Sequence, residues 1–247
     1  FYYNAFLMLS NGLEAKVGTL GSKYEFFHEW KRLKESDAGS VELETMLRGI
    51  CEKKTFLDLL ENFILYDHSG GRTTKILARN HQYLGVNEAV SAYENRKLKD
   101  GRLGVFWHTQ GSGKSYSMVF LAQKIRRKFA GSPTIVVLTD RDELNRQISD
   151  TFENCGLLGK TKASQFIASR GTDLVKKLQG NPSFVFTLIQ KFNLPKEPPI
   201  YPDHDILILS DEAHRSQYGV FADNMMHLLP TASRIGFTGT PLLADDH

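Results

Sequence analysis

The sequence has few cysteines and no long apolar run, and these absences exclude several classes of protein. Its 247 residues include only two cysteines, Cys51 and Cys155, which form no Cys-x-x-Cys pair. We therefore expect neither a disulfide scaffold nor a cysteine-ligated metal site, and two isolated thiols are typical of a reducing cytoplasm. Apolar runs such as Ile206–Leu209 are too short to span a bilayer, so we expect no membrane association.

A strong excess of one charge is also lacking. The 31 Lys and Arg residues nearly balance the 28 Asp and Glu residues, which leaves a formal net charge of +3. This mildly basic balance permits nucleic-acid binding but does not argue for it. The sequence begins without Met or a basic n-region, so we expect part of a longer chain and no signal peptide.

The chain divides into three predicted zones. Residues 1–36 are predicted to be β-rich, because the apolar run Ala5–Leu9 ends at Asn11-Gly12, a typical hairpin turn. Residues 37–75 are predicted to be a helical connector that begins at a Ser40 N-cap and carries apolar residues at helical spacing. A four-proline stretch at residues 194–202 is predicted to be a loop.

Residues 76–247 alternate between apolar strands and helical segments. The predicted strands are 103–107, 134–138, 184–189, 206–209 and 234–238. Near-continuous β-branched strands between helices indicate a parallel sheet with helices on both faces. The predicted fold class is therefore α/β, a doubly wound parallel sheet.

The stretch His108–Ser115 lies between a predicted strand and a predicted helix, as a phosphate-binding loop requires. Glycines let the backbone turn its N–H groups toward phosphate oxygens, and the helix N-terminus favours an anion there. Lys114 can reach the β- and γ-phosphates, and the Ser115 hydroxyl can bind Mg²⁺. The full pattern has a glycine where His108 stands here. The predicted ATP-binding residues are Gly111, Ser112, Gly113, Lys114 and Ser115.

The pair Asp211-Glu212 directly follows the apolar strand that ends near Leu209. A carboxylate at a strand end can hold the Mg²⁺ that Ser115 also binds, and the next one can position or deprotonate the attacking water. We therefore predict catalytic roles for Lys114, Asp211 and Glu212. The alternative is two solvated carboxylates that a helix N-terminus favours.

The segment Thr238-Gly239-Thr240-Pro241 follows the last predicted strand. Taken alone, it is a tight turn. In company with the other two motifs, we interpret Thr238 and Thr240 as residues that couple nucleotide state to a polynucleotide track.

Together these motifs resemble motifs I, II and III of superfamily 2 helicases and translocases. Within that superfamily the chain resembles the R (motor and endonuclease) subunit of type I restriction–modification enzymes. The resemblance covers nearly the whole chain and is carried by 106–115, 139–144, 211–219 and 236–242, with weaker support from 10–15 and 24–31. It implies a RecA-like first motor lobe in 76–247, with 1–36 as the end of a nuclease domain.

The resemblance assigns further residues. Gln82 matches the adenine-recognising glutamine of the family, and a carboxamide can pair with both the N6 donor and the N7 acceptor of adenine. The alternative is an exposed glutamine at a helix start. The residues that would contact DNA phosphates without reading bases are Thr139, Arg141, Gln147, Thr187, Gln190 and Lys191.

The resemblance also implies cofactors and partners, namely ATP, Mg²⁺, double-stranded DNA, and the methyltransferase and specificity subunits of a restriction complex. In this family a second lobe supplies an arginine finger, and nuclease carboxylates lie upstream. We therefore expect the chain by itself to bind ATP weakly, to hydrolyse it barely and to cut no DNA.

Three alternatives stay open at this point. One is another superfamily 2 motor, such as a chromatin-remodelling-like protein or an RNA helicase. The second is a small-molecule kinase, which has no use for Asp211-Glu212-Ala213-His214, and the third is an interaction module with a vestigial nucleotide site. We interpret the basic run Lys124–Lys128 as a solvated helix face, because cations are favourable near a helix C-terminus.

Overall fold

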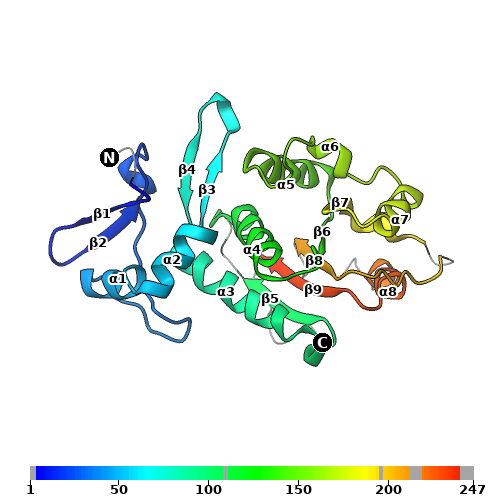
Figure 1. The fold of residues 1–247 in the computed structure, drawn as a ribbon, viewed down its shortest axis with the longest axis horizontal. Coiled ribbons are helices and arrows are strands. Elements are labelled where there is room, and N and C mark those ends of the chain that lie inside the picture. The colour runs from blue at the N-terminus through cyan, green and yellow to red at the C-terminus, as the bar shows by residue number, and fades with distance from the viewer. Residues whose placement is uncertain (1–3, 108, 110, 195–196, 212–218, 240–247) are drawn as a thin grey trace. The chain divides into compact units, whose positions relative to one another are not determined.

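The computed structural model describes residues 4–107, 109, 111–194, 197–211 and 219–239 (Figure 1). Its contacts divide the chain into two compact units. Unit 1 comprises Phe1–Glu88 with Asn154–Gly156, and unit 2 comprises Ala89–Glu153 with Leu157–His247. The domain boundaries predicted after residues 36 and 75 stay a prediction, since the contacts divide the chain after residue 88.

Unit 1 begins with the predicted hairpin. Strands β1 (Leu7–Ser10) and β2 (Ala15–Gly18) pair antiparallel, with Ser10 opposite Ala15. The side-chain oxygen of Asn11 accepts hydrogen bonds from the backbone N–H groups of Leu13 (3.0 Å) and Glu14 (2.8 Å), which closes the turn. A short 3₁₀ turn, η1 (Tyr24–Phe26), leads to His28, whose backbone bridges to Val17.

The zone 37–75 is only partly helical, so its prediction as a helical connector is corrected. Helices α1 (Leu43–Ile50) and α2 (Lys53–Asn62) are followed by an antiparallel hairpin of β3 (Ile64–Asp67) and β4 (Thr74–Leu77). The 3₁₀ turn η2 (Ser69–Gly71) contains Gly70 and Gly71 at positive φ, a conformation that costs other residues free energy and allows the hairpin. The N-cap of α1 is Glu42 and not the predicted Ser40, whose N–H bonds the carbonyl of Lys31.

Unit 2 contains the predicted parallel sheet (Figure 1). The strands are β5 (Arg102–Trp107), β6 (Thr134–Thr139), β7 (Phe184–Leu188), β8 (Ile206–Asp211) and β9 (Ser233–Thr238), in the order β5-β9-β8-β6-β7. All four neighbouring pairs are parallel. The carboxyl ends of all five strands therefore meet at one edge of the sheet, the edge where α/β proteins bind ligands.

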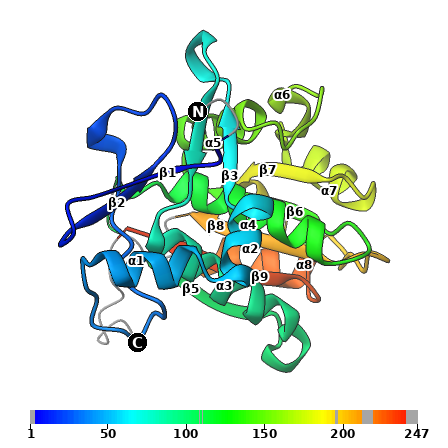
Figure 2. The ribbon, with the colours of Figure 1, turned by 60° about the vertical axis from the view of Figure 1, so that its left-hand side comes forward.

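Helices cover both faces of this sheet. On one face, Phe152 of α5 (Asp142–Asn154) makes edge-to-face contacts with Phe184 and Phe186. On the other face, α7 (Gly171–Gln179) and α8 (Gly219–Leu228) join one apolar cluster with residues of β6 and β8 such as Val136 and Ile208. Figure 2 shows the sheet and these helices from a second direction. The doubly wound α/β prediction is confirmed.

The remaining elements of unit 2 are mostly short. They are η3 (Arg96–Lys99), α4 (Lys114–Lys128), α6 (Ala163–Phe166) and η4 (Ile189–Phe192). The described residues of the proline-rich stretch 194–202 form no helix or strand, as predicted. None of the helices in the described part of the chain has the length and apolar character that crossing a bilayer needs.

Two predictions about burial are wrong. The apolar strand 103–107 reads from its sequence as a buried one, but only Leu103 and Phe106 are buried, whereas Val105 and Trp107 are 47% and 55% exposed. Their strand lies at the end of the sheet and packs beside β9 alone among the described strands. The basic run at the end of α4 is not uniformly solvated, because Lys124 is buried and Arg126 is half-buried. The Arg126 guanidinium donates to the carbonyls of Pro133 (3.2 Å) and Ser183 (3.4 Å).

Both cysteines are free thiols, as the sequence predicts. Cys51 is exposed, whereas Cys155 is partly covered, and burial together with the nearby Asp67 carboxylate raises the pKa of the Cys155 thiol to about 12. This thiol stays protonated near neutral pH, which makes it a poor nucleophile.

The buried ring of His28 makes unit 1 sensitive to acid. Burial, with the charges of Arg79 and His81, lowers the pKa of His28 from 6.5 to about 4, and the backbone groups of Glu29 and Leu77 only partly oppose this shift. The unfolded chain therefore binds the proton more readily than the folded chain, and stability falls as the pH drops from about 6.5 toward 4. Between pH 7 and pH 5 we expect a loss of roughly 2 kcal/mol from this group.

Urea unfolding of the wild type and of His28→Phe at both pH values measures this loss. The variant should lose less stability on acidification, because its ring takes up no proton. An equal loss in both proteins would contradict the assignment.

Candidate nucleotide site at the carboxyl edge of the parallel sheet

The predicted phosphate loop connects β5 to α4, at the carboxyl edge of the sheet. Gly111 and Gly113 have φ values of 80° and 90°, in the left-handed region that side chains disfavour. Gly113 is the N-cap of α4, and the loop is closed by a hydrogen bond from the Ser112 N–H to the Thr109 carbonyl (3.1 Å). The helix begins at Lys114 as predicted, so its amino end faces this loop.

Lys114 and Asp211 form an ion pair across the sheet edge. The distance between Lys114 Nζ and Asp211 Oδ1 is 3.1 Å, although the two residues are 97 positions apart in the sequence. Their side chains are only 16% and 4% exposed. Two motifs that the sequence analysis singled out separately are thus brought together in one buried cluster.

The parallel pairing of the strands explains why Lys114 and Asp211 lie close together. Strand β9 lies between β5 and β8, with Trp107 opposite Thr238 and Phe237 opposite Asp211. The phosphate loop therefore begins where β5 ends, at the same edge at which β9 ends with Thr238 and β8 ends with Asp211. Thr238 is fully buried, and its coupling role stays a prediction.

Ser115 is half-buried in the first turn of α4. Its hydroxyl and the Asp211 carboxylate are both oxygen ligands, the kind that Mg²⁺ prefers. The chemistry of these donors fits the predicted metal site. Among the described residues, no group of three or more His, Cys, Asp and Glu side chains offers a second metal site. Glu212 and Thr240 lie outside the described residues, as do His108 and Gln110.

The predicted DNA contacts follow the next strands at the same edge, but they differ in exposure. Arg141 is exposed beyond β6, and its Nε lies 3.5 Å from Asp140 Oδ2. Gln190 is exposed beyond β7 and donates to the Asp140 carbonyl (3.0 Å), which ties the two loops together. Gln147 is exposed on α5.

The other predicted contacts are less accessible. Thr139 and Thr187 are fully buried, and each hydroxyl donates to a nearby backbone carbonyl at 3.4 Å. The Lys191 ammonium is partly covered and donates to the carbonyl of Ala168. These side chains support the loops in this structure, so a direct phosphate contact by them stays a prediction.

Gln82 lies in unit 1, in the first turn of α3 (Asn80–Glu94). It is buried, unlike the exposed glutamine of the alternative interpretation. Its Oε1 accepts a hydrogen bond from the Arg79 N–H (2.9 Å), as the third residue of a helix does in a capping box. The role of Gln82 in adenine recognition stays a prediction.

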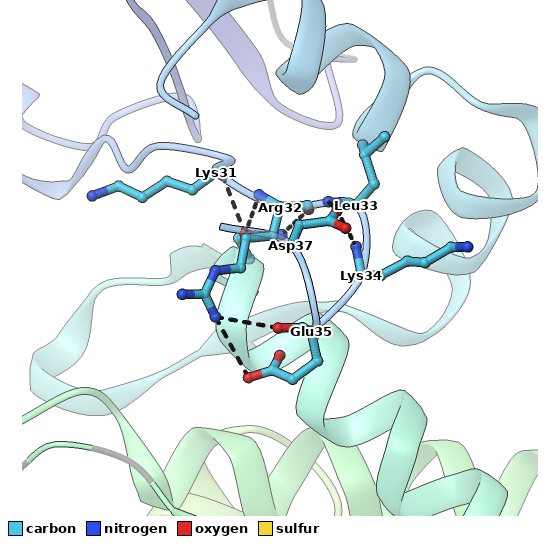
Figure 3. Close-up of polar contacts among 7 residues, drawn as sticks. Lys31, Arg32, Leu33, Lys34, Glu35 and Asp37 are labelled. Carbon is cyan, nitrogen blue, oxygen red and sulfur yellow. Dashed lines mark hydrogen bonds and ion pairs between the residues drawn. The ribbon is translucent and has the colours of Figure 1, made fainter. Parts of the chain in front are cut away.

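Sequence reasoning missed two structural residues. Asn80, two residues before Gln82, makes three hydrogen bonds to the segment Lys31-Arg32, which Figure 3 shows. Arg126 ties the end of α4 to the residues just before β6 and β7, at the amino edge of the sheet. The preference of Asn for helix starts could have indicated Asn80, but no local signal indicates its distant partners.

Comparison with known proteins gives the site a family context. The profile of the SWI2/SNF2 ATPase family matches residues 81–247. The chain is 38% identical to the type I restriction enzyme HindI endonuclease subunit of Haemophilus influenzae, over 100% of this chain and 26% of that protein. It is 32% identical to the putative type I restriction enzyme MjaIXP endonuclease subunit of Methanocaldococcus jannaschii, over 98% and 25%. The chain thus spans about a quarter of the length of these relatives.

A solved structure supports the fold. The UvsW helicase from bacteriophage T4 superposes with a TM-score of 0.52 at 18% identity, over 76% of this chain and 60% of that one. At this identity the likeness concerns the fold alone, an α/β fold with a five-stranded parallel sheet.

The Lys114–Asp211 pair generates a test by double substitution. Lys114→Ala leaves a buried Asp211 carboxylate without this cation, so we expect a loss of roughly 3 kcal/mol in unfolding free energy. The double variant Lys114→Ala/Asp211→Asn removes the charge as well and should recover most of that loss. Urea unfolding of the two single variants, the double variant and the wild type gives the coupling energy. A coupling energy near zero would contradict a direct ion pair.

Proposed function

The chain belongs to the SWI2/SNF2 ATPase family and is homologous to the endonuclease subunits of type I restriction enzymes, and from this premise we propose that it forms the ATP-binding lobe of a motor that moves along double-stranded DNA. The observation that carries the proposal is the contact between Lys114 and Asp211. It joins a phosphate-binding loop and an acidic strand end in one site, as a nucleotide-hydrolysing motor requires.

In this site the chain binds the triphosphate of ATP. The backbone N–H groups of Gly111 and Gly113 face the phosphates, the Ser112 N–H closes the loop onto Thr109, and the amino end of α4 favours the negative charge of the phosphates. When the triphosphate binds, the Lys114 ammonium contacts phosphate oxygens in place of the Asp211 carboxylate. Gln82 recognises the adenine base through its carboxamide.

Ser115 and Asp211 would hold Mg²⁺, which would neutralise charge that develops on the phosphates. Asp211 is then freed from Lys114 to face the metal. Glu212 orients the attacking water and accepts its proton. Thr238 and Thr240 pass the state of the nucleotide to the DNA-binding loops, which follow β6 and β7 on the other side of β8.

The DNA contacts come from the loops after β6 and β7. Of the predicted contact residues there, Arg141 and Gln190 are exposed, and Thr139 and Lys191 support their loops. Such contacts would go to the phosphate backbone, which suits a motor that moves over any sequence. In the complete protein we propose a cytoplasmic restriction complex, with 1–36 as the end of the nuclease domain and methyltransferase and specificity subunits as partners.

The nucleotide part of the proposal is tested by ATP binding. Loss of the Lys114 ammonium removes a charge-assisted contact with the phosphates, so Lys114→Ala should weaken ATP·Mg²⁺ binding by roughly 10- to 100-fold. The matched control is Lys128→Ala, which removes a lysine from the other end of α4, where it pairs with Glu94 at 3.1 Å. Titration calorimetry with thermal melts separates weak binding from unfolding. An unchanged affinity of folded Lys114→Ala for ATP·Mg²⁺ would contradict the assignment of the phosphate loop.

The DNA part is tested with duplexes of unrelated sequence. Arg141→Ala should weaken binding to each duplex by a similar factor and reduce the slope of log affinity against log salt by about one. The control Lys176→Ala removes one exposed charge from α7, outside the loops that follow β6 and β7. Fluorescence anisotropy over a salt series gives both quantities. A salt slope that Arg141→Ala leaves at the wild-type value would refute the assigned contact.

A further inference from the structure

One face of the parallel sheet in unit 2 is covered over only part of its width. On this face α7 and α8 pack on β6 and β8 through the apolar cluster that includes Val136 and Ile208. The register places Arg234 of β9 opposite Ile208 and Gly236 opposite Ser210, so Arg234 and Gly236 belong to the same face. Among the described residues, the cluster includes none from β5 or β9. The cover that α7 and α8 provide therefore ends at β8.

On β5 the same face is exposed. Val105 lies opposite Gly236, and Trp107, two residues further along the strand, shares its face. These two apolar side chains are the ones that are about half exposed. The other face of the two strands is closed, because Phe106 and Phe237 are buried with ring centroids 5.0 Å apart. Strands of a parallel sheet are normally buried on both faces, so β5 lacks half of its usual cover.

Two arginines stand at the amino end of this exposed face. Arg102 of β5 lies directly opposite Arg234 of β9, and no acidic side chain in the described part of the chain forms an ion pair with either. Burial lowers the pKa of Arg234, and the charge of Arg102 lowers it further. Like charges directly opposite each other on neighbouring strands are unfavourable, and a carboxylate placed between them would relieve the repulsion.

The residues Arg102, Val105, Trp107, Arg234 and Gly236 thus form an uncovered strip along β5 and β9. Its apolar part lies three residues beyond its basic part, roughly 10 Å along the strand. Two turns of an α-helix rise about 11 Å, so a helix with an apolar stripe can place acidic side chains two turns away over the arginines. Helices are the usual cover of such a sheet. The backbone of a DNA duplex would pair with the arginines but would leave the apolar side chains in water.

We propose that the uncovered strip is the docking site of an amphipathic acidic helix that belongs to the longer protein outside these 247 residues. The docked helix covers Val105 and Trp107 and gives the two guanidinium groups carboxylate partners. This chain spans about a quarter of the length of its relatives, which leaves ample sequence for such a helix. The inference rests on the proposed function in one respect, namely that the chain is part of a longer motor subunit.

Thiol labelling at position 105 tests the docking. Val105→Cys should react rapidly with a maleimide in the 247-residue chain and about tenfold or more slowly in the complete protein, because the helix covers it there. Peptide mass spectrometry reads the label at position 105 alone, whatever other thiols react. The matched control is Leu98→Cys in η3, where the native side chain is 86% exposed, and it should react at similar rates in both proteins. Equal rates at position 105 in both proteins would overturn the proposal.

Substitution of Arg102 tests the charge of the helix. In the 247-residue chain Arg102→Gln removes the repulsion with Arg234, so the melting temperature should stay the same or rise. In the complete protein the same substitution removes a partner of the docked carboxylates, so labelling of Val105→Cys should become about threefold faster or more. Arg102→Lys keeps the charge and should keep the protection. Full protection in the complete protein with Arg102→Glu would refute an acidic occupant.

Other occupants of the uncovered strip give different results, and each of them overturns the proposal. Protection of position 105 in the 247-residue chain that grows with protein concentration would identify a second copy. Protection there at every concentration would identify a cover within the chain itself. Protection that requires added duplex DNA would identify DNA as the occupant.

The docking and the proposed function can also fail separately. If Lys114→Ala weakens ATP binding while position 105 stays reactive in the complete protein, the nucleotide site stands and the docking alone is refuted. If position 105 is protected while Lys114→Ala leaves ATP binding unchanged, the docking stands and the nucleotide site is refuted.

Discussion

The parallel pairing of β5, β9 and β8 is the constraint on which the rest of the nucleotide site depends. It brings the ends of three strands to one level and thereby sets Lys114 within 3.1 Å of Asp211 across 97 residues of sequence. A burial as deep as that of Asp211 is costly for a carboxylate unless a cation lies beside it. The Asp211 carboxylate therefore depends on the Lys114 ammonium for its charge balance. A substitution that removes either charge leaves the other without this ion pair.

The loops after β6 and β7 lie at this same carboxyl edge of the sheet. The loops after β6 and β7 are linked through the bond from Gln190 to the Asp140 carbonyl, and Arg141 stands exposed beside that link. The groups proposed to bind the phosphates and Mg²⁺ therefore lie at or just after the ends of β5, β9 and β8, and those proposed to contact DNA lie at or just after the ends of β6 and β7. One sheet can couple the proposed nucleotide site to the proposed DNA contacts because its strands are packed and hydrogen-bonded side by side. A displacement at the end of one strand can therefore displace the end of the next.

In unit 1, by contrast, contacts between side chains stabilise short helices and strands. Its two hairpins have only two strands each, too few for independent stability. The buried rings of Trp30 and Phe63 with Tyr83, together with the amide of Asn80, supply that support around the start of α3. The same packing encloses the His28 ring, so protonation of that ring at acid pH destabilises unit 1.

The sequence by itself determined the parallel α/β sheet, the five strand positions, the loop before Lys114 and the first hairpin, because each depends on local periodicity or on glycine at a turn. It also determined that Asp211 ends a strand. Only the tertiary structure decided that Asp211 pairs with Lys114, that Thr139 and Thr187 are buried, and that Arg126 is partly enclosed. It likewise placed residues 64–77 in a hairpin, although residues 64–75 belonged to the zone predicted to be helical, and it gave Asn80 its partners. These features depend on which strands are neighbours and which segments meet at long range, and no local pattern encodes that.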